Sequence, residues 1–283
     1  MRADLHIHTH YSDGACSPDQ IAAMAKSAGL ALISMTDHDS LAGYEEKAAA
    51  AEKYGLSYVQ GWEISAYSGS KKVHVLGYGC RVCAAYEAFL QARREGALAR
   101  TKDVLNKAND YFGVNVTLAD VERFHIKKDT PVHAMHVVAA YCERLCRTKE
   151  ELYDTAFAPG GACHSLIGRP TPQDAIDVIH QTGGVAVLAH PGRLAMEQEE
   201  RLVFLRRMVT QGLDGIECIH SDHTEQQTEQ FAALAQAYGL LETGGSDFHA
   251  EGRGRDVGLP SFTPSESLLA ALRRTVGANE KDG

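Results

Sequence analysis

The sequence predicts an α/β fold of the barrel type, in which parallel strands alternate with helices. Short apolar runs at 30–35, 56–64 and 185–189 alternate with segments of helical periodicity, as in repeated β/α units. Histidines and acidic residues stand at the ends of these runs one after another. Because the active sites of β/α barrels lie at the carboxyl ends of their strands, the pattern predicts a barrel whose mouth carries one site.

The first predicted strand covers residues 4–8, an apolar run that is too short for a helix. Alternate side chains of a strand share a face, so His6 and His8 point the same way, about 7 Å apart at the backbone. One metal ion could therefore contact both imidazoles. A lone His-x-His pair is more often incidental, so this interpretation depends on the residues that follow.

Further strands are predicted at 30–35, 56–64, 72–78, 185–189, 215–219 and 240–245, and most of them carry or precede residues of the same kinds. The full set of candidate metal ligands is His6, His8, Asp13, His38, Glu63, His74, His190, Asp247 and His249. This mixed set of nitrogen and oxygen donors suits Mn²⁺, Zn²⁺ or Fe²⁺ better than Mg²⁺ or Ca²⁺ alone. Among these ions we favour Mn²⁺.

Helices are predicted between the strands. Ser17 and Pro18 have the residue types of a helix cap and first turn, and Gly29 ends the helix that follows. Other helices are predicted at 41–54, 174–182, 199–211, 224–238 and 264–275.

The alternation stops in the middle of the chain. Residues 83–165 show helical periodicity, few strand-like runs and many Lys and Arg residues, and the segment is too long for a loop. We therefore expect a barrel formed by residues 1–82 and 166–283 that is interrupted by an inserted helical subdomain at 83–165.

The motifs, in this order over residues 1–80 and 166–250, resemble those of the PHP (polymerase and histidinol phosphatase) phosphoesterases, which are amidohydrolase-like. The resemblance implies a distorted (β/α)7 barrel that holds three divalent metal ions, with the insertion over its mouth. It implies a first ion held by His6, His8, Glu63 and Asp247. It implies a second held by Glu63, His74 and His190, with Glu63 bridging, and a third held by Asp13, His38 and His249.

The resemblance also suggests residues that act on the substrate. Arg193, shortly after His190, matches a phosphate clamp, since a guanidinium can donate two hydrogen bonds to one phosphate. His133 keeps a histidine of the family, whereas His136 stands where relatives tend to have an arginine. Asp37, which precedes ligand His38, is expected to orient that imidazole or a metal-bound water.

Catalytic or substrate-binding roles are therefore predicted for Asp37, His133, His136 and Arg193. The remaining histidines that we considered, His10, His164, His180, His220 and His223, are expected at the surface.

Composition limits the class of protein. The chain has 283 residues, 44% of them hydrophobic, which is enough for a full core. Its start leaves no room for a signal sequence and no apolar run could span a membrane, so a soluble, cytoplasmic protein is expected. The seven scattered cysteines are expected to be reduced thiols, with a structural zinc site at Cys80 and Cys83 as the alternative.

The charge and the donor set together favour a small anionic substrate. A net charge of −9 disfavours extensive contacts with the phosphate backbone of long nucleic acid. Divalent metal ions would nevertheless make the site itself positive. By resemblance, the leading hypothesis is a hydrolase in which a metal-bound hydroxide attacks phosphorus. The preferred substrate is a five-membered cyclic phosphodiester of ribose phosphate or a nucleotide, such as phosphoribosyl 1,2-cyclic phosphate or a 2′,3′-cyclic nucleotide, opened and then dephosphorylated.

Other functions remain open at this point. The closest alternative is a 3′,5′-nucleoside bisphosphate phosphatase or a 5′→3′ exoribonuclease on short RNA, with a histidinol phosphate phosphatase as a lesser one. A hydrolase of C–N bonds and a non-catalytic metal-binding module are alternatives from different classes. The oligomeric state cannot be predicted from the sequence.

Overall fold

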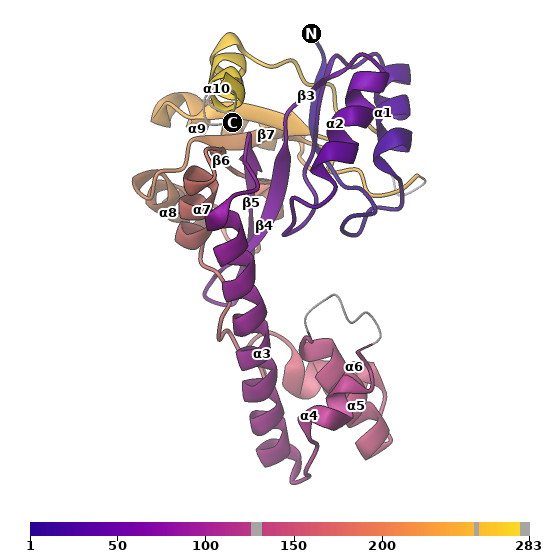
Figure 1. The fold of residues 1–283 in the computed structure, drawn as a ribbon. Helices are drawn as coiled ribbons and strands as arrows, with labels where there is room; N and C mark the ends of the chain where they lie inside the picture. Colours follow the sequence, from indigo (N-terminus) through magenta and orange to yellow (C-terminus); the bar gives the residue numbers. More distant parts are fainter. Residues whose placement is uncertain (126–131, 252–254, 278–283) are drawn as a thin grey trace. The chain divides into compact units, whose positions relative to one another are not determined.

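A computed structural model describes residues 1–125, 132–251 and 255–277. The chain divides into two compact units (Figure 1). Unit 1 comprises Met1–Tyr86 and Thr171–Gly283, and unit 2 comprises Glu87–Pro170. The candidate metal ligands all belong to unit 1.

Unit 1 is built on two sheets. The first is parallel and contains β1 (Ala3–Ile7), β2 (Leu32–Met35) and β3 (Ser57–Tyr58) in that order. The second contains β4 (Gly61–Ser68), β5 (Lys71–Tyr78), β6 (Val185–Leu188), β7 (Gly215–His220) and β8 (Leu241–Gly245) in that order. Strand β5 is antiparallel to both β4 and β6, whereas β6, β7 and β8 are parallel.

Of the predicted distorted (β/α)7 barrel, the coarser part, a mixed α/β fold, is confirmed. The two sheets meet at isolated bridges, one between His38 and Glu63 and one between Ile7 and Phe248. The expected single strand at 56–64 is divided between the two sheets. Residues 57–58 pair with β2, while β4 begins at Gly61 and pairs with β5. The ends of β1, β2, β4 and β8 are nevertheless neighbours, which is what the site requires.

Helices of unit 1 cover the sheets. They are α1 (Pro18–Ser27), α2 (Tyr44–Lys53), α7 (Pro172–Gln181), α8 (Gln198–Thr210), α9 (Glu225–Tyr238) and α10 (Glu266–Gly277), with a 3-10 turn η2 (Pro191–Arg193). Capping boxes start α1 at Ser17, α7 at Thr171 and α9 at Thr224, and each satisfies backbone N–H groups that the first turn leaves unpaired. Helix α7 packs on β4, β5 and β6, and α9 packs on β7 and β8 (Figure 1).

Apolar side chains fill the space between these elements. One core cluster joins β1 and β2 to α1 and α2 through residues such as Ile7, Ile21 and Ile33. A second joins β1, β5 and β6 to α10 through Leu5, Leu76 and Leu268, among others. Both faces of β1 are therefore buried, which fixes its strand end rigidly.

Unit 2 is helical throughout its described residues. Its elements are α3 (Ala84–Phe112), which begins in unit 1, α4 (Leu118–Glu122), α5 (Ala134–Leu145), α6 (Lys149–Leu152) and the π-helix η1 (Tyr153–Phe157). It has its own core, which includes Val104, Val137, Tyr141 and Leu152. The barrel and insertion boundaries predicted from the sequence, 82 and 166, lie within five residues of the ends of this unit.

Two further expectations concerned the cysteines and membrane-spanning segments. None of the seven cysteines is paired in a disulfide. Among the described residues, no helix is both long and apolar enough to cross a membrane.

Candidate metal centre

The strand ends of unit 1 bring the nine predicted ligands together. His6 and His8 come from β1 and its end, Glu63 from β4 and His74 from β5. The remaining ligands lie on loops, namely Asp13 after β1, His38 after β2, His190 after β6, and Asp247 and His249 after β8. Ligand atoms lie within 4.8 Å of one another in three sets: His6, His8, Glu63 and Asp247; His8, Asp13, His38 and His249; and His38, Glu63 and His74.

Glu63 is at the centre of the cluster and is fully buried. Its Oε2 lies 3.2 Å from His8 Nε2 and 3.0 Å from His38 Nδ1. Its Oε1 lies 2.7 Å from His74 Nδ1 and 2.9 Å from His190 Nε2. The two carboxylate oxygens thus face two different groups of imidazoles, which is the arrangement that a bridging ligand needs.

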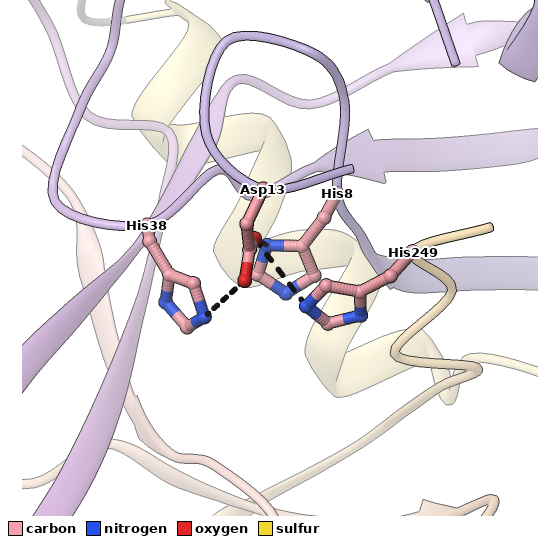
Figure 2. Close-up of side chains that lie close together, drawn as sticks. All are labelled: His8, Asp13, His38 and His249. Carbon is pink, nitrogen blue, oxygen red and sulfur yellow. Dashed lines mark ion pairs between the residues drawn. The ribbon is translucent and has the colours of Figure 1, made fainter. Parts of the chain in front are cut away.

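A second carboxylate, Asp13, lies among His8, His38 and His249 (Figure 2). Its oxygens are 3.4 Å from His249 Nε2 and 3.8 Å from His38 Nε2, and its side chain is 57% exposed. The His8 ring stacks on His249 with ring centroids 4.1 Å apart. This part of the cluster is open to solvent at Asp13, whereas His8 is fully buried.

Asp247 faces two ways. Its Oδ1 lies 3.1 Å from His8 Nε2 and 3.4 Å from His6 Nε2, toward the cluster. Its Oδ2 accepts hydrogen bonds from Arg193 Nη1 at 2.9 Å and from Arg255 Nη1 at 2.5 Å. One oxygen is therefore available to an ion while the other is held by cationic side chains.

Buried ligand atoms without hydrogen-bond partners indicate that these residues could hold metal ions. Several buried ligand atoms that face one another have no hydrogen-bond partner within the part of the chain that is described: His6 Nε2, His8 Nε2, His38 Nδ1 and Glu63 Oε2. Buried polar atoms without a partner are rare, because each lost hydrogen bond with water costs free energy. Divalent ions among these atoms would satisfy them.

The electrostatics of the cluster favour the ligand forms of its carboxylates. Burial alone would raise the pKa of Glu63, but the charges of His74 and His6 and hydrogen bonds from neighbouring imidazoles hold it well below its usual range. Burial lowers the pKa of His74 to about 4 in spite of the nearby Glu63. In spite of burial, neighbouring carboxylates raise the pKa of His6 and His8, so these imidazoles favour the protonated form without metal. Ionised carboxylates and neutral imidazoles are the forms that bind metal, so metal binding would release protons from these histidines.

Glu217 supports the cluster from behind and was not predicted. It is fully buried on β7 and accepts a hydrogen bond from His6 Nδ1 at 3.0 Å and from the backbone N–H of His190 at 2.7 Å. Such a partner fixes which ring nitrogen of a histidine faces the ion. The sequence signal that could have identified Glu217 was an acidic residue inside an otherwise apolar strand.

His220 corrects the sequence analysis. We expected it at the surface, but it is 2% exposed and its Nε2 lies 3.4 Å from Asp247 Oδ2. It is the last residue of β7, so the rule used for the other strand ends would have found it. His223 is half-buried, and its Nε2 accepts a hydrogen bond from the backbone of Gly192.

Asp37 anchors the loop that leads to Asp13. Its carboxylate accepts hydrogen bonds from Thr9 N–H at 2.8 Å and Ser12 Oγ at 2.6 Å. Its other oxygen lies 2.5 Å from Lys47 Nζ, and this lysine of α2 is only 1% exposed. The ion pair is therefore buried behind the site. The predicted role of Asp37 in orienting His38 or a water stays a prediction.

A cavity of about 450 Å³ opens over the cluster within unit 1. Besides the ligands, it is lined by Lys72, Arg193, Asp222 and Arg255. Arg193, the predicted phosphate clamp, is among these lining residues, and its role toward phosphate stays a prediction. Lys72 and Arg255 were missed, although Lys72 stands two residues before His74 on β5.

The other two predicted substrate residues belong to unit 2. His133 caps α5, and its backbone N–H donates to His136 Nδ1 at 3.1 Å. Burial, with the neighbouring His136 and His125, lowers the pKa of His133 to about 4. Their predicted roles toward the substrate stay predictions.

The fold and the donor set define an α/β protein with a metal-binding centre. A PHP domain matches residues 4–245, so the chain belongs to the PHP family, and the resemblance inferred from its motifs is confirmed. The chain is 34% identical over 262 residues to the 3′,5′-nucleoside bisphosphate phosphatase of Chromobacterium violaceum, with 90% of both chains covered.

Two further comparisons cover most of the chain. It is 33% identical over 273 residues to the phosphoribosyl 1,2-cyclic phosphate 1,2-diphosphodiesterase of Eggerthella lenta, covering 91% of this chain and 98% of that protein. A solved amidohydrolase from Chromobacterium violaceum, with bound sulfate and no metal, has a TM-score of 0.70 at 28% identity over 97% of each chain.

Proposed function

We propose that the protein is a metal-dependent phosphoesterase that acts on a small phosphorylated metabolite. The observation that carries this proposal is the convergence of the ligand-type residues around Glu63, with unpartnered buried atoms facing one another. Three divalent ions, with Mn²⁺ preferred, would be held by the ligand sets stated from the sequence. Glu63 would bridge the first two, because its two oxygens face different imidazoles.

Metal ions at such a centre supply a nucleophile at neutral pH and neutralise phosphoryl charge. The chain's own residues would position the substrate. Arg193, Lys72 and Arg255 place positive charge along the cavity that leads to the ligands, where a phosphate group would enter. Glu217 would hold the imidazole of His6 in its ligating orientation and would fix the backbone at His190. His133 and His136 are proposed to contact the rest of the substrate.

For the substrate, we infer a five-membered cyclic phosphodiester of ribose phosphate or a nucleotide, which is opened and then dephosphorylated. The relative from Eggerthella lenta carries the name of such an activity. His136 supports the same inference, because it lacks the permanent charge that an arginine would offer to a second phosphate.

A 3′,5′-nucleoside bisphosphate is the second candidate, because a relative of equal similarity from Chromobacterium violaceum is named for that activity. An exoribonuclease activity on short RNA would use the same chemistry. Histidinol phosphate remains the lesser alternative among these substrates.

The test compares phosphate release from cyclic, bis- and monophosphates of ribose and nucleosides after reconstitution with Mn²⁺. We expect the five-membered cyclic phosphate to be hydrolysed with the highest kcat/KM. We also expect His136→Arg to raise activity on the bisphosphate, whereas His136→Gln, which adds no charge, should not. A wild-type preference for the bisphosphate of more than about tenfold, or about 1.4 kcal/mol, would replace the first candidate by the second.

A further inference from the structure

Two arginines in the cavity converge on one exposed carboxylate. Arg193 Nε lies 3.5 Å from Asp222 Oδ2, and Arg255 Nη2 donates a hydrogen bond to the same oxygen. Both guanidinium groups also contact Asp247 Oδ2. A pair of guanidiniums that share one oxygen is a strong binding arrangement for an anion.

The two carboxylates differ in their surroundings. Asp247 is 2% exposed and its other oxygen faces the metal ligands, so it is part of the centre. Asp222 is 41% exposed and lines the cavity, and it is absent from the candidate ligand groups found among the described residues. Its carboxylate therefore contacts the arginines from the solvent-exposed side.

The main chain at Asp222 is held in place. Its backbone N–H donates to His220 Nδ1 at 3.0 Å, and the preceding Ser221 Oγ donates to the carbonyl of Ser246 at 3.0 Å. Only the short side chain must rotate for the carboxylate to leave the arginines. Exposed ion pairs add little net stability, so this rotation is easy compared with breaking the buried contacts of Asp247.

We propose that the carboxylate of Asp222 occupies the position of a substrate phosphoryl oxygen between Arg193 and Arg255, and that the phosphate group displaces it on binding. The chemical class of the ligand, a phosphate ester, rests on the function proposed above. Carboxylate and phosphate oxygens match the same planar guanidinium donors. Asp222 would therefore compete with any anion that enters the position between the two arginines.

A purely structural role for Asp222 predicts the opposite result when its charge is removed. If Asp222 only positions the arginines, then Asp222→Asn should loosen them and weaken anion binding. If Asp222 competes with the phosphate, the same variant should bind phosphate more tightly. The substitution replaces one carboxylate oxygen by an amide NH₂ group and nearly keeps the volume of the side chain, so the fold is expected to persist.

The experiment measures binding of inorganic phosphate by isothermal titration calorimetry, on protein with and without Mn²⁺. We expect Asp222→Asn to bind about tenfold more tightly than wild type, the scale of one unfavourable charge removed from the site. Glu225→Gln is the matched control, because it removes one exposed negative charge from the next helix, and we expect unchanged binding. Unchanged or weaker phosphate binding by Asp222→Asn overturns the proposal.

A second variant tests whether Arg255 supplies positive charge for phosphate binding. Arg255→Gln should weaken phosphate binding about tenfold or more, and combining it with Asp222→Asn should remove most of the gain from the latter. If the double variant kept the full gain in phosphate affinity, Asp222 and phosphate would not be competing for the two arginines. Phosphate binding needs no turnover, so a failure of the proposed phosphoesterase activity would remain distinguishable from a failure of this inference.

Discussion

At the scale of single residues, Glu63 is the ligand whose loss should have the widest effect. Its two oxygens face separate groups of imidazoles, so one substitution removes a donor from two proposed ions. We expect Glu63→Gln, purified without chelator, to lose most of two metal equivalents per chain, as measured by elemental analysis. Glu242→Gln, an exposed carboxylate of β8, is the control and should keep the wild-type content. Retention of all ions by Glu63→Gln would exclude the bridge.

The buried pair of Lys47 and Asp37 gives a prediction of stability. Lys47→Met leaves Asp37 buried without its cation, and breaking a buried ion pair typically costs about 3–5 kcal/mol of unfolding free energy. Urea denaturation measures this loss. Lys53→Met is matched on the same helix, but its pair with Asp19 is solvent-exposed, so little change is expected. Equal losses of unfolding free energy in the two variants would contradict the prediction that the buried pair contributes more to stability than the exposed pair.

The sequence was sufficient to find the nine residues that the structure gathers into the candidate metal centre, because their types are readable and most of them stand at or just after strand ends. It did not reveal Glu217, Lys47 or Arg255. Lys47 lies in an Ala- and Glu-rich helix whose lysines look alike, and only the tertiary contact with Asp37 distinguishes it. Arg255 is recognisable only once the loop after β8 is placed beside Asp222.

At the scale of elements, the contact between β1 and β8 sets the position of two ligands. The backbone N–H of Asp247 donates to the carbonyl of His6, and His8 N–H donates to the carbonyl of Phe248. Gly245, at the end of β8, makes this approach possible, because a Cβ atom there would lie 2.3 Å from Cβ of His6.

We therefore expect Gly245→Ala to push β8 away from β1. The expected loss of unfolding free energy is about 1–3 kcal/mol, as for an overpacked core, together with a lower metal content. Gly239→Ala is the comparison, since its Cβ would meet open space and only its left-handed backbone, with φ at 65°, is strained. It should lose stability but retain metal. Full metal content in Gly245→Ala would contradict the argument.

The sequence predicted most of the elements but not how the strands pair. Helices near 199–211 and 224–238 are found at Gln198–Thr210 and Glu225–Tyr238, because caps and periodicity are local signals. The division of 56–64 between two sheets was not predicted, although Gln60 and Gly61 interrupt the apolar run where it occurs. Strand pairing depends on partners that are distant in sequence, such as Tyr78 for Gly61.

At the scale of the whole molecule, the proposed ions should stabilise unit 1 and leave unit 2 unaffected. The ligands belong to unit 1, while unit 2 has a core of its own. A bound ion at a thousand times its Kd contributes about 4 kcal/mol. Hydrogen exchange with and without a chelator should therefore show faster exchange in β1 and β4 after metal removal, with α5 unchanged. Equal loss of protection in α5 would contradict this separation.

The most direct measurement of the central claim is a titration of metal-free protein with Mn²⁺, in which phosphate release from a five-membered cyclic ribose phosphate is followed alongside metal binding. We predict that release rises only as about three ions per chain are bound, and that Glu63→Gln stays inactive at any Mn²⁺ concentration. Full turnover with no added metal, or with a single equivalent, would contradict the account.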